Sequence, residues 1–224
     1  MTHHRAVALM VLVTLLWSIA GVVTRHLEAA RSFEVTFWRS LFTALVLALV
    51  LTALRGSALW CGLWRAGRLL WASAMCWAVM FTAFMVALTL TSVANVLVTM
   101  AIGPMVTALF SSIFLGKRLA NRTWLAILAA GAGIVWMFGA EAGSGASLLG
   151  SLVASAVPVA GAANWTLLQR VGEAGAEAPD MLPAVLLGAM ISALFALPLA
   201  LPLQASAHDL GLLALLGTVQ LALP

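Results

Sequence analysis

Charged residues are scarce in this chain, and tyrosine is absent. Of the 224 residues only 8% are charged, whereas 64% are hydrophobic and the mean hydropathy is +1.12. Soluble globular domains contain about a quarter charged residues, so this composition excludes that class of protein. The 11 Lys and Arg outnumber the seven Asp and Glu, but they stand singly or in threes between apolar segments. That pattern is typical of membrane topology signals and does not predict nucleic-acid binding.

Cysteine and histidine are also few. Cys61 lies in an expected polar connection and Cys76 inside an apolar segment, so the two thiols should lie at different depths and no disulfide is expected. The sequence has no CxxC motif and no His/Cys cluster, so we predict neither a metal site nor a cofactor. The deep parts of the apolar segments lack Asp, Glu, Lys and His. Facilitated diffusion or exchange therefore fits better than a proton relay, unless a group at the rim such as Glu34 titrates.

Groups that could form a catalytic site are equally rare in the polar connections. The acids in the predicted cytoplasmic connections are Glu173, Glu177 and Asp180, and no His accompanies them. A membrane-embedded acyl- or phosphotransferase needs clustered acids, a His base or a metal set. The sequence therefore does not predict an enzyme.

Long apolar segments follow one another along the chain. Each has about the 20 residues that a helix needs to cross the hydrocarbon core. Seven complete segments lie at about 6–24, 33–54, 69–89, 93–115, 123–140, 148–169 and 181–203. An eighth starts near Leu210 and runs to Pro224, which suggests a chain that is truncated early. Because backbone groups in lipid must be satisfied within their own segment, the sequence predicts an all-α polytopic membrane protein.

The basic residues alternate between the two sides of the predicted membrane. Eight of the 11 fall on the side of the N-terminus, namely Arg5, Arg55, Arg65, Arg68, Lys117, Arg118, Arg122 and Arg170. The opposite side receives only Arg25 and Arg31. By the positive-inside rule we expect a cytoplasmic N-terminus in a multi-pass protein of the cell inner membrane, with the first segment retained as an uncleaved span.

Two stretches of the sequence resemble each other. When "GVVTRHLEAARSFEV" (21–35) is set beside "TLLQRVGEAGAEAPDM" (166–181), Arg25 falls on Arg170, and each stretch joins one span to the next. Five spans separate the copies, so the second copy would enter the membrane from the opposite side, as in the inverted repeats of secondary transporters. We therefore expect a first repeat over 1–140 and an incomplete second repeat over 141–224.

Longer stretches resemble a known family. "LLWSIAGVVTRHLE", "FEVTFWRSLFTALVLAL" and "LLGSLVASAVPVAGAANWTLLQRV" look like segments of EamA-type transporters of the drug/metabolite transporter superfamily. The most specific part is the unit of the fourth and fifth spans, with mid-span Pro104, "FLGKRL" and a Gly-rich helix. The chain departs from the family at Lys117, where Glu is usual, and at Ile19, where a polar residue is common.

This resemblance implies a fold and an activity. The family has ten helices in two inverted five-helix repeats, both termini in the cytoplasm and a central cavity, and about seven and a half of these helices are present here. It transports small metabolites, amino acids or drugs, often as exporters. We expect a small-molecule substrate and a lipid bilayer as partners and make no prediction of oligomeric state.

Arg39 is the one cation expected inside a span. It lies about six residues below the end of the second apolar segment. A guanidinium at that depth must snorkel to the interface or be paired. Two interpretations remain open: snorkelling beside Glu34 and Trp38, or contact with an anionic substrate group such as a carboxylate.

The remaining candidate substrate-binding residues are aromatic or polar groups inside spans. For these residues packing between helices is favoured over ligand binding, and both interpretations remain open. They are Trp17 and its neighbour Ser18, Trp77, Asn95, Thr99 and Asn164. Asn95 and Thr99 belong to a small and polar stripe along the fourth span, which also contains Ser92, Gly103, Thr107 and Ser111. Pro104 is expected to kink that span.

These observations predict a transporter. The function expected is the movement of a small metabolite by alternating access, with export as the expected direction. The alternative is a structural or assembly subunit without transport activity, whose polar helix faces would serve partner proteins. A membrane-embedded enzyme is a distant third interpretation.

Overall fold

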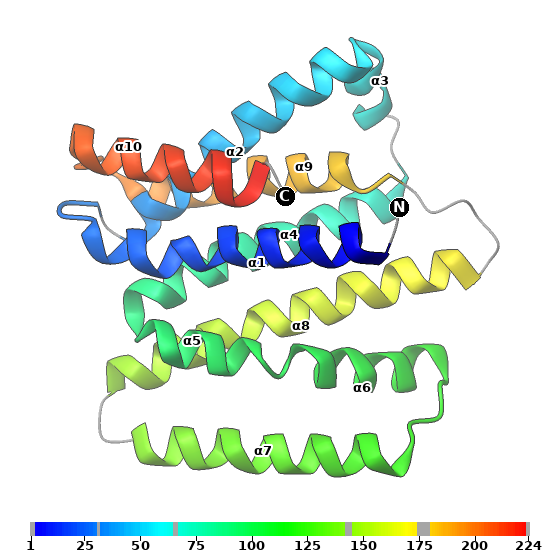
Figure 1. The fold of residues 1–224 in the computed structure, drawn as a ribbon. Helices are drawn as coiled ribbons and strands as arrows, with labels where there is room; N and C mark the ends of the chain where they lie inside the picture. Colours follow the sequence, from blue (N-terminus) through cyan, green and yellow to red (C-terminus); the bar gives the residue numbers. More distant parts are fainter. Residues whose placement is uncertain (1–2, 31, 65–66, 142–144, 174–179, 223–224) are drawn as a thin grey trace.

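The computed structural model describes residues 3–30, 32–64, 67–141, 145–173 and 180–222, and all regular structure among them is helical. Figure 1 shows the helices running side by side, most of them roughly parallel or antiparallel. In chain order they are α1 (His3–Val23), the 3-10 turn η1 (Thr24–His26), α2 (Ser32–Arg55), α3 (Ala58–Trp64), α4 (Arg68–Leu90), α5 (Val93–Met100), α6 (Gly103–Leu115), α7 (Asn121–Glu141), α8 (Gly145–Glu173), α9 (Leu182–Ala200), α10 (Ala207–Leu215) and the π-helix η2 (Leu216–Ala222).

Six helical segments in the described part of the chain are long and apolar enough to cross a membrane. They are Val7–His26, Ser32–Arg55, Arg68–Leu90, Val93–Leu115, Leu148–Glu173 and Leu182–Ala200. A further helix of 21 residues, α7, occupies the position predicted for the fifth span. The predicted fold class, an all-α polytopic membrane protein, is confirmed.

Two details differ from the sequence-based expectation. The connection that was expected to be polar and irregular around Cys61 is helical, because α3 occupies Ala58–Trp64. The fourth span is not one helix but two, α5 and α6, which are separated at Ala101 and Ile102. Pro104 lies in the first turn of α6, where a missing N–H removes no hydrogen bond of the helix. The expected kink is therefore a complete break.

This break also divides the predicted polar stripe. Ser92 is the N-cap of α5, and its hydroxyl accepts a hydrogen bond from the Asn95 N–H at 3.2 Å. Thr99 donates to the carbonyl of Asn95 one turn earlier, at 2.8 Å. On α6, Ser111 donates to Gln169 of α8 at 3.2 Å. The stripe thus caps one helix and joins another to α8, rather than forming one continuous face.

The helix α4 lies at the centre of the bundle. It packs along both α8 and α9, and α2 packs along α9. Glycines allow close approach at these crossings, since a Cβ added at Gly188 would lie 2.5 Å from the Cβ of Trp77 and 3.0 Å from the Ala74 carbonyl oxygen. Small residues at helix crossings are the usual means of packing within lipid, where no hydrophobic force drives helices together.

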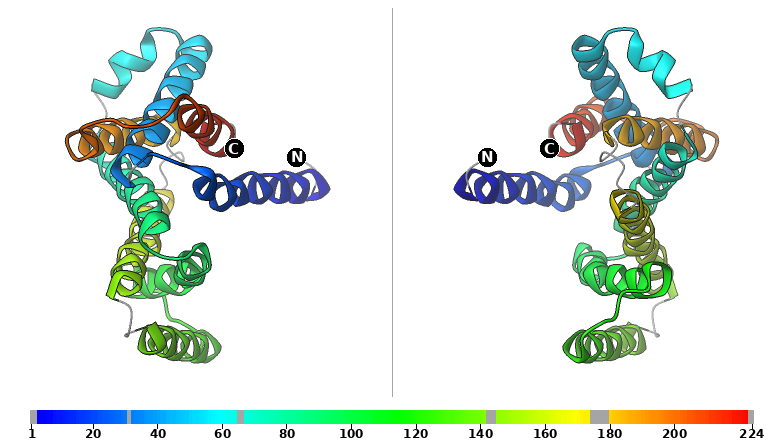
Figure 2. Two further views of the ribbon diagram at one scale, coloured as in Figure 1. Left: turned by 90° about the vertical axis from the view of Figure 1, so that its left-hand side faces the viewer. Right: turned by 90° about the vertical axis from the view of Figure 1, so that its right-hand side faces the viewer.

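By contrast, α1 stands apart from the bundle. Figure 2 shows it leaving the other helices at an angle. Its C-terminal residues Ala20 and Val23 are buried in an apolar cluster with Val35 and Leu213, whereas many of its earlier apolar side chains are exposed. The buried apolar contacts of α1 among the described residues therefore lie toward its C-terminal end.

The two ends of the bundle carry different connections. The Glu34 end, on the left in Figure 1, holds residues 24–30, the α4–α5 junction and residues 201–206. The Arg55 end, on the right, holds α3, the turn from α6 to α7 and the approach to α9. Gly116 ends α6 there with φ of 66°, a left-handed conformation that favours glycine, and the basic turn of Lys117 and Arg118 follows.

Candidate functional site

Arg39 lies in the interior of the bundle. It is the eighth residue of α2, about 10 Å from the start of that helix at 1.5 Å per residue. Only 2% of its surface is exposed. The snorkelling interpretation is therefore wrong, because the side chain turns into the protein and not along α2 toward the interface.

The surroundings of the Arg39 guanidinium are aromatic. Its central carbon lies 5.7 Å from the ring centres of both Phe81 and Phe84 on α4, a distance at which a cation and an aromatic face attract each other. Its Nε and Nη1 atoms are buried and have no hydrogen-bond partner among the described residues. None of the ion pairs found in those residues includes Arg39. Buried donors of a cation that lack an acceptor are unfavourable by several kcal/mol, so these two atoms make Arg39 a costly group at this position.

Hydroxyl groups fix α2 at the level of Arg39. The hydroxyls of Ser40 and Ser192 are 3.1 Å apart, and those of Ser192 and Thr82 are 2.9 Å apart, so one chain of hydroxyls joins α2, α9 and α4. On another side of α2, Thr43 donates to the carbonyl of Gly217 in η2 at 3.0 Å. Three segments, α4, α9 and η2, therefore meet α2 at the level of Arg39.

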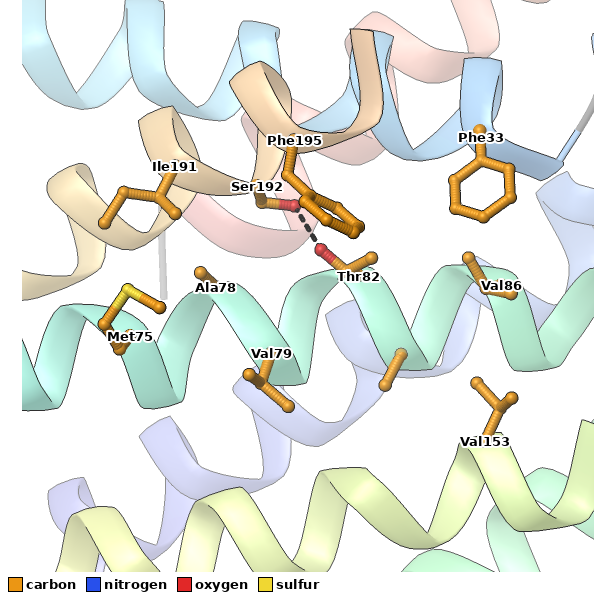
Figure 3. A pocket seen from close by; sticks show the side chains of 11 residues that line it. Phe33, Met75, Ala78, Val79, Thr82, Val86, Val153, Ile191, Ser192 and Phe195 are labelled. Carbon is orange, nitrogen blue, oxygen red and sulfur yellow. Dashed lines mark hydrogen bonds between the residues drawn. The ribbon is translucent and has the colours of Figure 1, made fainter. Parts of the chain in front are cut away.

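An apolar cavity of about 390 Å³ opens beside this hydroxyl chain. Figure 3 shows the hydrogen bond between Thr82 and Ser192 between α4 and α9, with apolar side chains around it. The lining residues are Phe33, Met75, Ala78, Val79, Thr82, Ala83, Val86, Val153, Ile191, Ser192 and Phe195. Met75, Val79 and Phe195 are exposed on the bundle surface. None of the seven predicted site residues lines this cavity, which suits hydrocarbon better than a polar solute.

Two of the predicted residues lie at helix crossings near the centre. Trp77 packs against Phe81 with ring centres 5.4 Å apart, and its buried Nε1 has no hydrogen-bond partner in the described chain. Asn164 is buried on α8 and accepts a hydrogen bond from Ser73 of α4 at 2.6 Å. Asn164 thus forms a hydrogen bond with a neighbouring helix, as the packing interpretation expected.

Asn95 and Thr99 lie on α5, whereas Arg39 lies on α2. The amide nitrogen of Asn95 donates to the Thr91 hydroxyl at 3.1 Å. Thr99 is buried and bonds within its own helix. These hydrogen bonds lie near the start of the broken span.

Trp17 and Ser18 lie on α1, the helix that leaves the bundle at an angle. The Trp17 side chain is 47% exposed, and its carbonyl oxygen accepts a hydrogen bond from the Gln220 amide of η2 at 3.3 Å. Ser18 donates to the carbonyl of Leu15 within α1. The seven predicted residues are therefore spread over α1, α2, α4, α5 and α8. Arg39 contacts α4 through Phe81 and Phe84, which are not among the seven.

Sequence reasoning missed the role of two acids at the Glu34 end. Glu34 and Asp209 are both fully buried, and each occupies the third position of its helix. Glu34 accepts two backbone N–H groups and Asp209 accepts three from segments distant in sequence. Burial raises the pKa of Asp209, but hydrogen bonds from Glu28, Ala29, Ala30 and Ser206 outweigh it and hold that pKa below its ordinary value. The available signal was a Ser N-cap followed by an acid in the first turn at Ser206 and Asp209.

Comparison with known proteins identifies the family. No curated protein and no solved structure matches the chain. The model of the EamA-like transporter family matches residues 4–139, which is more than half of the chain. This family lies within the drug/metabolite transporter superfamily and consists of transporters rather than enzymes. The match agrees with the bundle of apolar helices, and the chain belongs to the EamA-like transporter family.

Proposed function

We propose that this multi-pass membrane protein is a secondary transporter that exports a small metabolite, such as an amino acid, a related compound or a drug, by alternating access. The family and the bundle of membrane-spanning helices support transport. The observation that carries the proposal of a solute site is the buried Arg39 guanidinium, whose Nε and Nη1 lack an acceptor in the described chain. A solute with a carboxylate would supply that acceptor.

The packing of the helices supports a repeated architecture. The helix α4 packs on α8 and α9, while α10 packs on α2 and its continuation η2 packs on both α1 and α2. These pairs correspond if α8 repeats α1, α9 repeats α2 and α10 repeats α4, which is the order of the proposed repeats over 1–140 and 141–224. Rocking of one repeat against the other is the usual form of alternating access.

The distribution of charge supports the orientation. Lys117, Arg118 and Arg122 lie at the Arg55 end together with Arg55, Arg68 and Arg170. We propose that this end faces the cytoplasm, that the Glu34 end faces outward, and that the membrane is the cell inner membrane.

The proposed solute site is centred on Arg39. Its guanidinium would bind the carboxylate, and Trp77, whose buried Nε1 lacks a partner, would supply a neighbouring aromatic contact. Trp17 and Ser18 would face the solute from α1, and Asn95, Thr99 and Asn164 from α5 and α8. Asn164 and Thr99 already take part in hydrogen bonds within the protein, so we expect their substitution to affect solute binding less than that of Arg39.

The test measures ligand-dependent thermal stabilisation of the purified protein. Each probe carboxylate is paired with its neutral amide, for example phenylalanine with phenylalaninamide and leucine with leucinamide. We expect carboxylates to stabilise the native protein, Arg39→Lys to weaken the effect and Arg39→Gln to abolish it. The control is Arg25→Gln, because Arg25 is an exposed cation at the same end of the bundle. Equal stabilisation of the native protein and Arg39→Gln would remove Arg39 from the site.

Reconstitution tests transport itself. Proteoliposomes loaded with a stabilising solute should release it faster than liposomes containing Arg39→Gln. If no solute stabilises the protein and none crosses the membrane, the assembly-subunit interpretation replaces the transporter.

A further inference from the structure

Two buried acids bind the connections at the Glu34 end of the bundle. Each acid accepts hydrogen bonds from the connection that precedes the helix of the other acid. We name Glu34, Asp209 and the backbone of residues 28–30 and 204–205 the crossed clasp. We propose that the crossed clasp is the gate at this end and must release before solute can pass, an inference that rests on the proposed transport function. Sequence reasoning considered Glu34 as a titrating group at the rim or a neighbour of Arg39, and it assigned neither acid a role in closing this end.

Glu34 forms the first half of the clasp. Its Oε1 accepts the N–H of Gln204 at 2.8 Å and the N–H of Ala205 at 2.7 Å. Its Oε2 is buried and has no hydrogen-bond partner among the described residues. One oxygen of this carboxylate therefore holds the α9–α10 connection.

Asp209 forms the second half. Its Oδ1 accepts the N–H of Glu28 at 3.0 Å, and its Oδ2 accepts the N–H groups of Ala29 and Ala30 at 3.0 and 3.1 Å. Ser206 positions it, because the Ser206 hydroxyl caps α10 by accepting the N–H of Asp209 at 3.1 Å. Both oxygens of this carboxylate hold the connection between α1 and α2.

The two halves cross. Glu34 follows the α1–α2 connection and binds the α9–α10 connection, whereas Asp209 follows the α9–α10 connection and binds the α1–α2 connection. Neither connection can leave its place without breaking hydrogen bonds to a charged group. Hydrogen bonds of this kind are about twice as strong as those between neutral groups.

The clasp covers an apolar seal. Ala20 of α1, Val35 of α2, and Leu213 and Leu216 near the C-terminal end lie in one buried cluster at this end. These residues come from both halves of the chain, so the clasp and the cluster together join the proposed first repeat to the second. Alternating access requires that this junction open when solute leaves at the Glu34 end. Because α1 packs on η2, separation of α1 and α2 from α10 and η2 would expose Ala20.

Thiol labelling measures this opening without any solute. In a background with Cys61→Ser and Cys76→Ser, Ala20→Cys places a reporter thiol in the seal, where Ala20 is 1% exposed. A membrane-impermeant maleimide is added to right-side-out and to inverted membrane vesicles. With Glu34→Gln or Asp209→Asn we expect labelling from the Glu34 side to be about tenfold faster. This is the change in the open population expected when the closed state loses one charge-assisted hydrogen bond.

Two further variants make the result specific. Glu28→Gln removes an exposed carboxylate whose side chain takes no part in the clasp, although its backbone N–H does, and labelling should stay at the native rate. Ser206→Ala removes only the cap that positions Asp209, so labelling should rise to an intermediate rate even if Asp209→Asn does not fold.

The outcomes are distinct for gate and transporter. The gate is overturned if folded Glu34→Gln, Asp209→Asn and Ser206→Ala proteins all label at the native rate, even when their thermal stability falls. It is also overturned if labelling rises equally in Glu28→Gln. If the clasp variants label faster but the native protein moves no solute, the clasp still holds the Glu34 end closed, and the proposed transport function fails together with the role of the clasp as a gate for solute.

Discussion

The Glu34 end and the Arg55 end of the bundle are held together in different ways. At the Glu34 end, two fully buried carboxylates accept five backbone N–H groups across the junction. At the Arg55 end the described ion pairs are exposed: Arg55 with Asp180, and Lys117 with Glu173. Exposed pairs contribute about 0–1 kcal/mol each, whereas buried hydrogen bonds to a charge contribute more. The comparison indicates that the Glu34 end is the more firmly closed of the two.

The largest effect is expected from Asp209→Ala. This change leaves the N–H groups of Glu28, Ala29 and Ala30 without their acceptor, and it should lower the free energy of unfolding by about 3 kcal/mol. Thermal unfolding of the protein in detergent measures it. Glu28→Ala is the control, because the exposed Glu28 side chain forms no part of the clasp. Equal losses in the two variants would contradict the difference between the ends.

A smaller loss is expected from Gly217→Ala, which tests the contact of η2 with α2. An added Cβ would lie 2.6 Å from the Phe42 Cβ and 2.7 Å from the Arg39 carbonyl oxygen, so the helices must separate. Overpacking of this kind lowers stability by about 2 kcal/mol. Gly211→Ala on α10 is the control, since no atom lies within 4 Å of its added Cβ. Native stability in Gly217→Ala would show that η2 does not pack on α2.

Acid should weaken the Glu34 end selectively, with a smaller effect than either substitution because a neutral carboxyl still accepts hydrogen bonds. The pKa of Asp209 is lowered in the folded protein. The ionised Asp209 therefore contributes its full stabilisation above the ordinary Asp pKa of about 4. This stabilisation is lost as the pH falls through the lowered pKa of the folded protein. Thermal unfolding between pH 7 and 3 should show this loss in the native protein. Asp209→Asn should lack it, and the same profile in both proteins would exclude Asp209 as its source.

Ser73→Ala tests a central crossing that belongs to neither end. It removes the hydrogen bond from Ser73 on α4 to Asn164 on α8, and such interhelical bonds contribute about 0.6 kcal/mol within membranes. Ser155→Ala is the matched control, since its hydroxyl bonds only the Leu152 carbonyl of its own helix. A loss as large as that of Asp209→Ala would mean that the centre, and not the Glu34 end, dominates stability.

The smallest effect is expected at the Arg55 end. Lys117→Gln removes the 2.7 Å pair with Glu173, and Arg55→Gln removes the pair with Asp180. Each should change stability by less than about 1 kcal/mol, and salt should reduce the difference further. Unfolding measured at low and high salt checks this. A loss at the Arg55 end equal to that at the Glu34 end would remove the contrast between them.

The sequence was sufficient for the positions of the long apolar helices, but not for every break and short helix or for the roles of the polar residues. The predicted span at 93–115 lies at the observed position, and Pro104 indicated the irregularity within it. That α5 and α6 are separate helices depends on Ala101 and Ile102, which carry no breaking signal of their own. The helix α3 was missed because a short segment around Cys61 has too few residues for a periodic pattern.

The candidate site shows the same limit more clearly. Arg39 stood out from the sequence because a cation inside an apolar segment is rare. Whether it snorkels depends on which helix faces it, and Phe81 and Phe84 lie far from it in the sequence. The hydrogen bonds of Glu34 and Asp209 to distant connections were missed, because acids contribute little to membrane topology and Glu34 was considered only as a titrating rim group or a neighbour of Arg39. Their partners are backbone N–H groups, which every sequence position except proline offers, so no pattern of residue types could identify them.

The sequence by itself determined that apolar helices of membrane length form and where their basic connections fall, because both depend on the composition of continuous segments. The tertiary structure alone decided that Arg39 is buried against two phenyl rings and that Glu34 and Asp209 hold each other's loops. The physical reason is that a polar group in a low-dielectric interior is stabilised by whichever partner the packed helices bring to it, and that partner is distant along the chain.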